Sequence, residues 1–62
     1  MLKTVEEGRI KDVRKLPNGT YEVVQKTTKG HTIRYRDFKK EPRINGKKIK
    51  LNEIYEQGTV IS

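Results

Sequence analysis

The chain has 62 residues, no cysteine and a formal net charge of +7 at pH 7. This length allows one domain, residues 1–62, with a small core, and the lack of cysteine excludes disulfides, thiolate nucleophiles and the usual zinc sites. No stretch approaches the roughly 20 apolar residues that span a bilayer, and the N-terminus lacks the apolar run of a signal peptide, so we expect a soluble cytoplasmic protein without a membrane partner.

The positive charge is concentrated in the middle of the chain. Residues 1–25 have a net charge of +1, residues 26–50 of +8, and residues 51–62 of −2. Gathering like charges in one segment gives no advantage in folding, so this asymmetry indicates an anionic partner more than general solubility.

The first two thirds of the chain predict three long strands. Val, Ile, Thr and Tyr are dense in residues 8–16, 20–28 and 31–38, and turn-forming residues separate these stretches. After them, Asn45 and Gly46 predict a second, shorter hairpin.

The C-terminal residues predict a helical turn followed by a strand. Asn52 is a suitable N-cap, and Gly58 is suited to end a single turn. Residues 59–62 are predicted to form the last strand. We expect the core to include three side chains from this turn and the residue before it, Leu51, Ile54 and Tyr55.

The hairpin that joins the second and third long strands can be given a register. If Thr28, Lys29 and Gly30 form a three-residue loop, Thr27 pairs with His31. That register places Val23 opposite Tyr35 and Gln25 opposite Ile33 on one face, and Val24 opposite Arg34 and Glu22 opposite Arg36 on the other. It therefore predicts that Ile33 and Tyr35 face inward while Thr32, Arg34 and Arg36 face outward.

This order of elements predicts an all-β fold. We expect a small SH3-like barrel of five short antiparallel strands, with one helical turn before the last strand, because a barrel leaves no unpaired sheet edges. The alternative is an open three-stranded sheet with the C-terminal segment packed across one face.

Residues 8–36, "GRIKDVRKLPNGTYEVVQKTTKGHTIRYR", resemble the first three strands of the oligonucleotide-binding barrel found in the first bacterial translation initiation factor. The chain beyond residue 36 departs from that family, because it is too short for the usual remaining strands. No functional residue is therefore carried over from the family.

Enzymatic activity is not expected. His31 is the only histidine, and the sequence supplies no recognisable carboxylate and nucleophile to act with it. Glu6 and Glu7 are adjacent, so on a strand they point to opposite faces and are poorly placed to share a proton or a metal ion. We expect no catalytic residue, no metal site and no cofactor.

The basic segment predicts a nucleic-acid-binding protein that contacts the phosphate backbone with low sequence specificity. Arg34 and Arg36 lie about 7 Å apart along one strand face, close to the spacing of successive phosphates. Because few aromatic side chains accompany the cations, duplex DNA is preferred as the ligand, with RNA as a further candidate. The basic face in residues 26–50 comprises Arg34, Arg36, Lys39, Lys40, Arg43, Lys47, Lys48 and Lys50.

Two other partners remain open. A small basic domain could instead be a protein-interaction module or inhibitor that docks on an acidic protein surface, of the kind that a phage or mobile element encodes. A homodimer is also open, because exposure of Val24, Phe38 or Ile44 would leave apolar surface for a second copy to cover.

Overall fold

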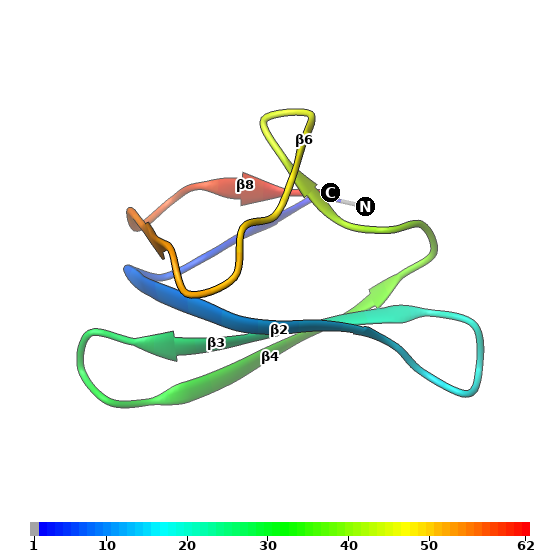
Figure 1. Cartoon of the computed structure of the whole chain (residues 1–62), viewed down its shortest axis with the longest axis horizontal. Helices are drawn as coiled ribbons and strands as arrows, with labels where there is room; N and C mark the ends of the chain where they lie inside the picture. The colour runs from blue at the N-terminus through cyan, green and yellow to red at the C-terminus, as the bar shows by residue number, and fades with distance from the viewer. Residues whose placement is uncertain (1) are drawn as a thin grey trace.

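The computed structural model describes residues 2–62, which form eight β-strands and no helix (Figure 1). Three strands are long: β2 (Gly8–Lys15), β3 (Tyr21–Thr27) and β4 (Thr32–Phe38). The predicted all-β class is confirmed, and the predicted bounds of these strands are correct to within one residue. The other five strands have two residues each: β1 (Lys3–Thr4), β5 (Arg43–Ile44), β6 (Lys47–Lys48), β7 (Ile54–Tyr55) and β8 (Val60–Ile61).

The strands form two antiparallel sheets that pack face to face. The long sheet has the order β4-β3-β2-β7, and the short sheet has the order β1-β8-β5-β6. Figure 1 shows the short sheet lying across one face of the long sheet, so the other face of the long sheet is open to solvent. The buried apolar residues between the sheets are Val5, Ile10, Val23, Phe38, Ile44, Ile49 and Ile61.

The predicted five-stranded SH3-like barrel is not what forms. Among residues 2–62, no strand of the long sheet pairs with a strand of the short sheet, so the two sheets do not close into a barrel. The strands β1 and β7, at the edges of the two sheets, have two residues each, which is too short for either to be shared between both sheets. The alternative prediction, an open three-stranded sheet with the C-terminal segment packed across it, describes the structure only in part. Strand β7 adds a fourth strand to the long sheet, and the C-terminal segment contributes to a second sheet.

The predicted helical turn at residues 52–58 is wrong. Asn52 has a left-handed backbone with φ of 65°, and its N–H donates to the carbonyl oxygen of Ile10 at 2.7 Å. Ile54 and Tyr55 then pair with β2 as strand β7. The edge of β2 has backbone groups that need partners, and this tertiary requirement overrides the local capping pattern. Leu51 and Ile54 are consequently exposed, and only Tyr55 packs against the core.

The predicted register of the hairpin between β3 and β4 is confirmed from the loop as far as Val23 and Tyr35, but the predicted pairing of Glu22 with Arg36 is lost to an irregularity. The N–H of Thr27 donates to the carbonyl oxygen of His31 at 2.8 Å, and Val23 pairs with Tyr35. The sequence did not predict the irregularity near the end of β4, where Tyr21 pairs with Phe38 instead of Asp37. Asp37 has a φ of 74°, and this extra residue turns Phe38 to the inner face of the sheet.

The apolar residues that suggested a homodimer are not exposed. Phe38 and Ile44 belong to the core, and Val24 is half-buried on the outer face of the long sheet. The exposed large apolar side chains are instead Leu2, Leu51, Ile54 and Val60.

Gly8 lies where β2 meets both of its neighbours, since it pairs with Thr27 of β3 and with Tyr55 of β7. A Cβ atom built on Gly8 would lie 2.6 Å from Cα of Thr27 and would also clash with the carbonyl oxygen of Lys26. Only glycine allows the strands to approach this closely.

We predict that Gly8→Ala destabilises the protein because the backbone of β3 must shift to admit the methyl group. Gly30→Ala is the matched control, because a Cβ atom there meets nothing within 4 Å and only the left-handed φ of 87° opposes it. That strain costs about 1–2 kcal/mol. Chemical denaturation should show a larger loss for Gly8→Ala than for Gly30→Ala, and equal losses would contradict the close approach of the strands.

Candidate functional site

The outer face of the long sheet, on the side away from the short sheet, gathers three arginines around one glutamate. Strand alternation places Val23 and Gln25 of β3 on the inner face, so Glu22 between Tyr21 and Val23 points outward. Arg14 of β2 pairs with Glu22, and Arg34 and Arg36 of β4 lie on its other side. We call this group of Arg14, Glu22, Arg34 and Arg36 the arginine face.

Glu22 is fully buried beneath these arginines, although it lies on the solvent side of the sheet. Its Oε1 accepts hydrogen bonds from Nε of Arg14 at 2.8 Å and from Nη1 of Arg34 at 3.3 Å, while Oε2 accepts from Nε of Arg36 at 2.6 Å. The hydrogen bond from Arg36, followed by that from Arg14, holds the pKa of Glu22 below its ordinary value of 4.5 despite the opposing effect of burial.

The arginines themselves remain about half exposed. The exposed fractions of the Arg14, Arg34 and Arg36 side chains are 51%, 47% and 58%. One carboxylate balances only one of the three guanidiniums, so the group has a net charge of +2. Arg14 and Arg36 use Nε for Glu22, and their Nη groups have no hydrogen-bond partner among residues 2–62. These N–H groups are available to an anion from solvent.

Further cations extend the outer face along the sheet. Lys26 of β3 pairs with Arg9 of β2 on one side and with Thr32 of β4 on the other. Nη1 of Arg9 donates to the carbonyl oxygen of Asn52 at 2.6 Å, which holds this side chain at the β7 edge. Besides Glu22, Asp12 of β2, which pairs with Val24, also places a carboxylate on this outer face.

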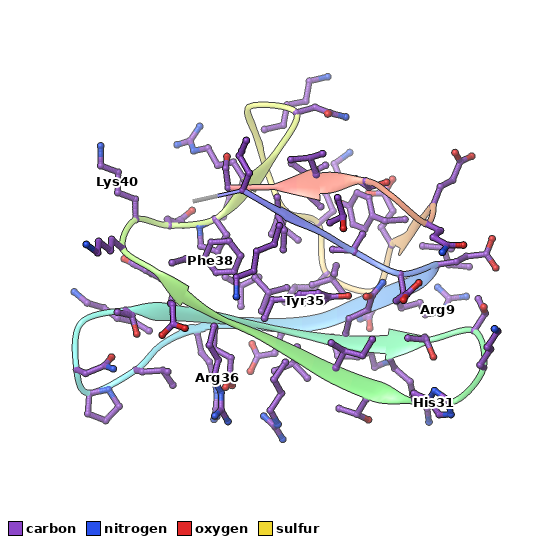
Figure 2. All side chains as sticks on the ribbon, turned by 180° about the vertical axis from the view of Figure 1, so that it is seen from behind. Arg9, His31, Tyr35, Arg36, Phe38 and Lys40 are labelled. Atoms are coloured by element: carbon purple, nitrogen blue, oxygen red, sulfur yellow. The ribbon has the colours of Figure 1, made fainter. Side chains whose placement is uncertain are left out.

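The eight basic residues that the sequence singled out do not lie on one surface. Arg34 and Arg36 face outward from the long sheet, as predicted. The other six lie in the loop after β4, in the β5–β6 hairpin and just beyond it, and they are Lys39, Lys40, Arg43, Lys47, Lys48 and Lys50. Figure 2 shows Arg36 pointing away from the short sheet, whereas Lys40 extends on the side of the short sheet.

We call these six residues the second basic region. Within it, Lys39, Lys40 and Arg43 line a hollow together with the acidic side chains of Asp37 and Glu41. The cations of this region are therefore interspersed with carboxylates, and its side chains belong to loops and to strands of two residues.

Sequence reasoning missed Arg14, the third member of the arginine face. The signal was present, because a hairpin turn at residues 16–20 sets Lys15 opposite Tyr21 and Arg14 opposite Glu22. The basic segment was defined from residue 26 onward, and that boundary excluded a residue that the sheet brings next to Arg34 and Arg36.

Aromatic side chains point away from the arginine face. Phe38 is in the core, 1% exposed, and Nζ of Lys3 lies 5.7 Å from the centre of its ring. The Tyr35 hydroxyl donates to Oε1 of Gln25 at 2.7 Å and accepts from the N–H of Glu6 at 3.1 Å. Burial raises the pKa of this hydroxyl. Neither ring is available on the arginine face as a platform on which a base could stack.

His31 lies in the exposed turn between β3 and β4, beside a hollow lined in part by Glu6, Glu7 and Thr28. Glu7 accepts a hydrogen bond from the hydroxyl of Thr28 at 3.0 Å. Within residues 2–62, no three His, Cys, Asp or Glu side chains are grouped to hold a metal ion, and no helix could span a membrane.

Comparison with protein families, with curated proteins and with solved structures finds no match for this chain. The resemblance of residues 8–36 to oligonucleotide-binding barrels is therefore not supported by a family match.

We predict that Glu22→Gln lowers stability at neutral pH, because the three neighbouring guanidiniums lose the carboxylate with which they form ion pairs. The folded-state pKa of Glu22 lies below 4.5, so its contribution is complete above pH 4.5 and is lost as the pH falls through the lower value. The difference in stability between wild type and Glu22→Gln should therefore shrink below pH 4.5.

Thermal unfolding followed from pH 7 to pH 2.5 measures this difference, with Glu53→Gln, an exposed carboxylate, as the control. A Glu22→Gln variant as stable as wild type at pH 7 would contradict the role of the carboxylate.

Proposed function

We propose that the protein binds nucleic acid without catalysing a reaction, and that the arginine face contacts the phosphate backbone with low sequence specificity. The observation that carries this proposal is the group of three half-exposed guanidiniums held by the buried Glu22. One arginine would balance the charge of Glu22, and the other two, which add hydrogen bonds to its oxygens, leave the group with a net charge of +2.

Preorganisation supports phosphate binding at this face. A free arginine side chain loses rotamer freedom when it binds an anion, and this loss weakens binding. Arg14 and Arg36 are already held through Nε, which leaves the end edge of each guanidinium, formed by its two Nη groups, without a hydrogen-bond partner among residues 2–62. Two such N–H groups can hold a phosphate or a guanine edge through parallel hydrogen bonds.

The dimensions of the arginine face suit a polymer of phosphates. Arg34 and Arg36 are separated by about 7 Å along β4, and Arg14 lies two strands away, at about 10 Å. These separations place the guanidiniums within reach of neighbouring phosphates along one backbone. A single small anion would occupy only part of the face.

Duplex DNA is the preferred ligand in this proposal, with RNA as a further candidate. The arginine face spans three strands, whereas the major groove accepts an α-helix or a two-stranded ribbon. A three-stranded surface therefore meets the backbone across the groove instead of reading base edges within it. The absence of a stacking aromatic side chain also favours a duplex over a single strand.

The second basic region has a different role in the proposal. Lys39, Lys40, Arg43, Lys47, Lys48 and Lys50 contribute long-range attraction that speeds encounter with a polyanion. Direct contact is assigned to Arg34 and Arg36 and is extended to Arg14 and to Lys26, which lies on the same outer face of the long sheet. The lack of cysteine supports a cytoplasmic location for this activity.

We predict that the double substitution Lys26→Gln with Arg34→Gln weakens duplex binding, while Lys47→Gln with Lys48→Gln has a smaller effect. Both variants lower the net charge equally. The first leaves Arg14 and Arg36 to hold Glu22, so it should remain folded. Two lost phosphate contacts would reduce the slope of log K against log salt by about 1.8.

Fluorescence titrations against duplex DNA, single-stranded DNA and duplex RNA, each at several salt concentrations, measure this slope. Equal weakening by the two variants would show that only net charge matters and would contradict the arginine face as the site. No binding of wild type to any of the three polymers in low salt would refute the proposed function itself.

A further inference from the structure

The outer strand of the long sheet, β4, has a free backbone edge. β4 pairs with β3 on one side only, and no hydrogen bond among residues 2–62 reaches the backbone of β4 from the other side. Thr27 and His31 form a hydrogen-bonded pair, so by alternation Gln25 with Ile33 and Val23 with Tyr35 form the next two. The N–H and C=O groups of Thr32 and Arg34 therefore point away from the sheet.

The two faces beside this edge differ in chemistry. On the outer face, Arg34 and Arg36 occupy alternate positions with about half of each side chain exposed. On the inner face, where β4 approaches the short sheet, a hollow is lined by Leu2, Lys3, Thr4, Tyr35 and Val60. Leu2 and Val60 are among the exposed large apolar residues, with 74% and 41% of their surface accessible.

We propose that this edge is a docking site for an extended acidic peptide segment of another protein, which adds to the long sheet as an antiparallel strand beside β4. The segment would alternate acidic and apolar residues. Its acidic side chains lie over Arg34 and Arg36, and its apolar side chains enter the hollow beside Leu2 and Val60. Main-chain hydrogen bonds to Thr32 and Arg34 provide the affinity, and the alternation provides the specificity.

Charge excludes a second copy of this chain as the occupant. Antiparallel pairing of β4 with another β4 would set arginines against arginines across the new edge, and like charges directly opposite each other destabilise a sheet. A strand with carboxylates at the same positions reverses the sign of that interaction. The inference does not rest on the proposed function, because the free backbone edge of β4 carries it, and Arg34 and Arg36 determine only that the docked strand is acidic.

The test uses an end-capped eight-residue peptide that alternates Glu and Val. In the proposed antiparallel pairing, the residues opposite Arg34 share its face, so the Glu residues direct their backbone N–H groups toward β4. Two further peptides of the same sequence are N-methylated, one at the Glu amides and one at the Val amides. Charge and composition are identical in the two methylated peptides, and only the edge that can pair differs.

We expect the parent peptide to slow amide hydrogen exchange at Thr32 and Arg34. Methylation of the Glu amides should weaken binding at least about tenfold, because paired backbone groups are lost, whereas methylation of the Val amides should have little effect. Equal affinity of the two methylated peptides, or a loss confined to the Val set, would overturn the proposal. Concentration-dependent protection of these amides without peptide would also overturn it, in favour of a second copy.

Thr32→Pro provides the matching change in the protein. Proline removes an N–H that faces the free edge and leaves the pairing with β3 intact, whereas Thr32→Val keeps that N–H. The Pro variant should bind the peptide at least about tenfold less tightly than the Val variant. If circular dichroism shows that Thr32→Pro does not fold, the methylated peptides decide the question alone. Because no nucleic acid is present, a negative result leaves the proposed function untouched.

Discussion

A buried carboxylate on the solvent side of a sheet is the constraint on which the rest of this structure depends. Glu22 has no exposed surface, and a charge removed from water is tolerated only when it is paired and hydrogen-bonded. Three arginines from the two neighbouring strands meet that requirement. Their stems and guanidiniums cover the outer face of the long sheet, where a chain of this size has few apolar side chains to place. The same contacts leave a surplus of positive charge in a fixed arrangement.

The part of the arginine face that could be predicted from the sequence is the part that local pairing determines. A three-residue loop ending in Gly30 sets the register of β3 and β4, and this register alone places Arg34 and Arg36 outward beside Glu22. The position of Arg14 beside Glu22 depends on the hairpin between β2 and β3, whose register is equally local. Net charge along the chain does not reveal this residue, because β2 and β4 come together only across the sheet. The alternation of side chains along the strands and the residues of the two turns are therefore sufficient to predict the arginine face.

The features that were predicted wrongly depend on contacts between distant segments. Asn52 and Gly58 have the local chemistry of a helical turn, but the edge of β2 needs backbone partners and extends Ile54 and Tyr55 into a strand. A barrel was expected because it removes sheet edges, yet the two-residue β1 pairs with β8 and leaves β4 open. The second basic region was placed with the arginines because it is close in sequence, whereas β5 and β6 belong to the short sheet and Lys40 extends on that side of the molecule. Closeness in sequence therefore does not show which segments come together in the fold.

The hydrogen bonds to Glu22 give the most direct test of this account. Nuclear magnetic resonance can resolve the Nε–H of each arginine and measure its exchange with water at pH 6. We predict slow exchange for Arg14 and Arg36, whose Nε–H groups donate to the carboxylate, and fast exchange for Arg34, which donates through Nη1. Fast exchange of all three Nε–H groups in the folded protein would contradict the claim that Glu22 organises the arginine face.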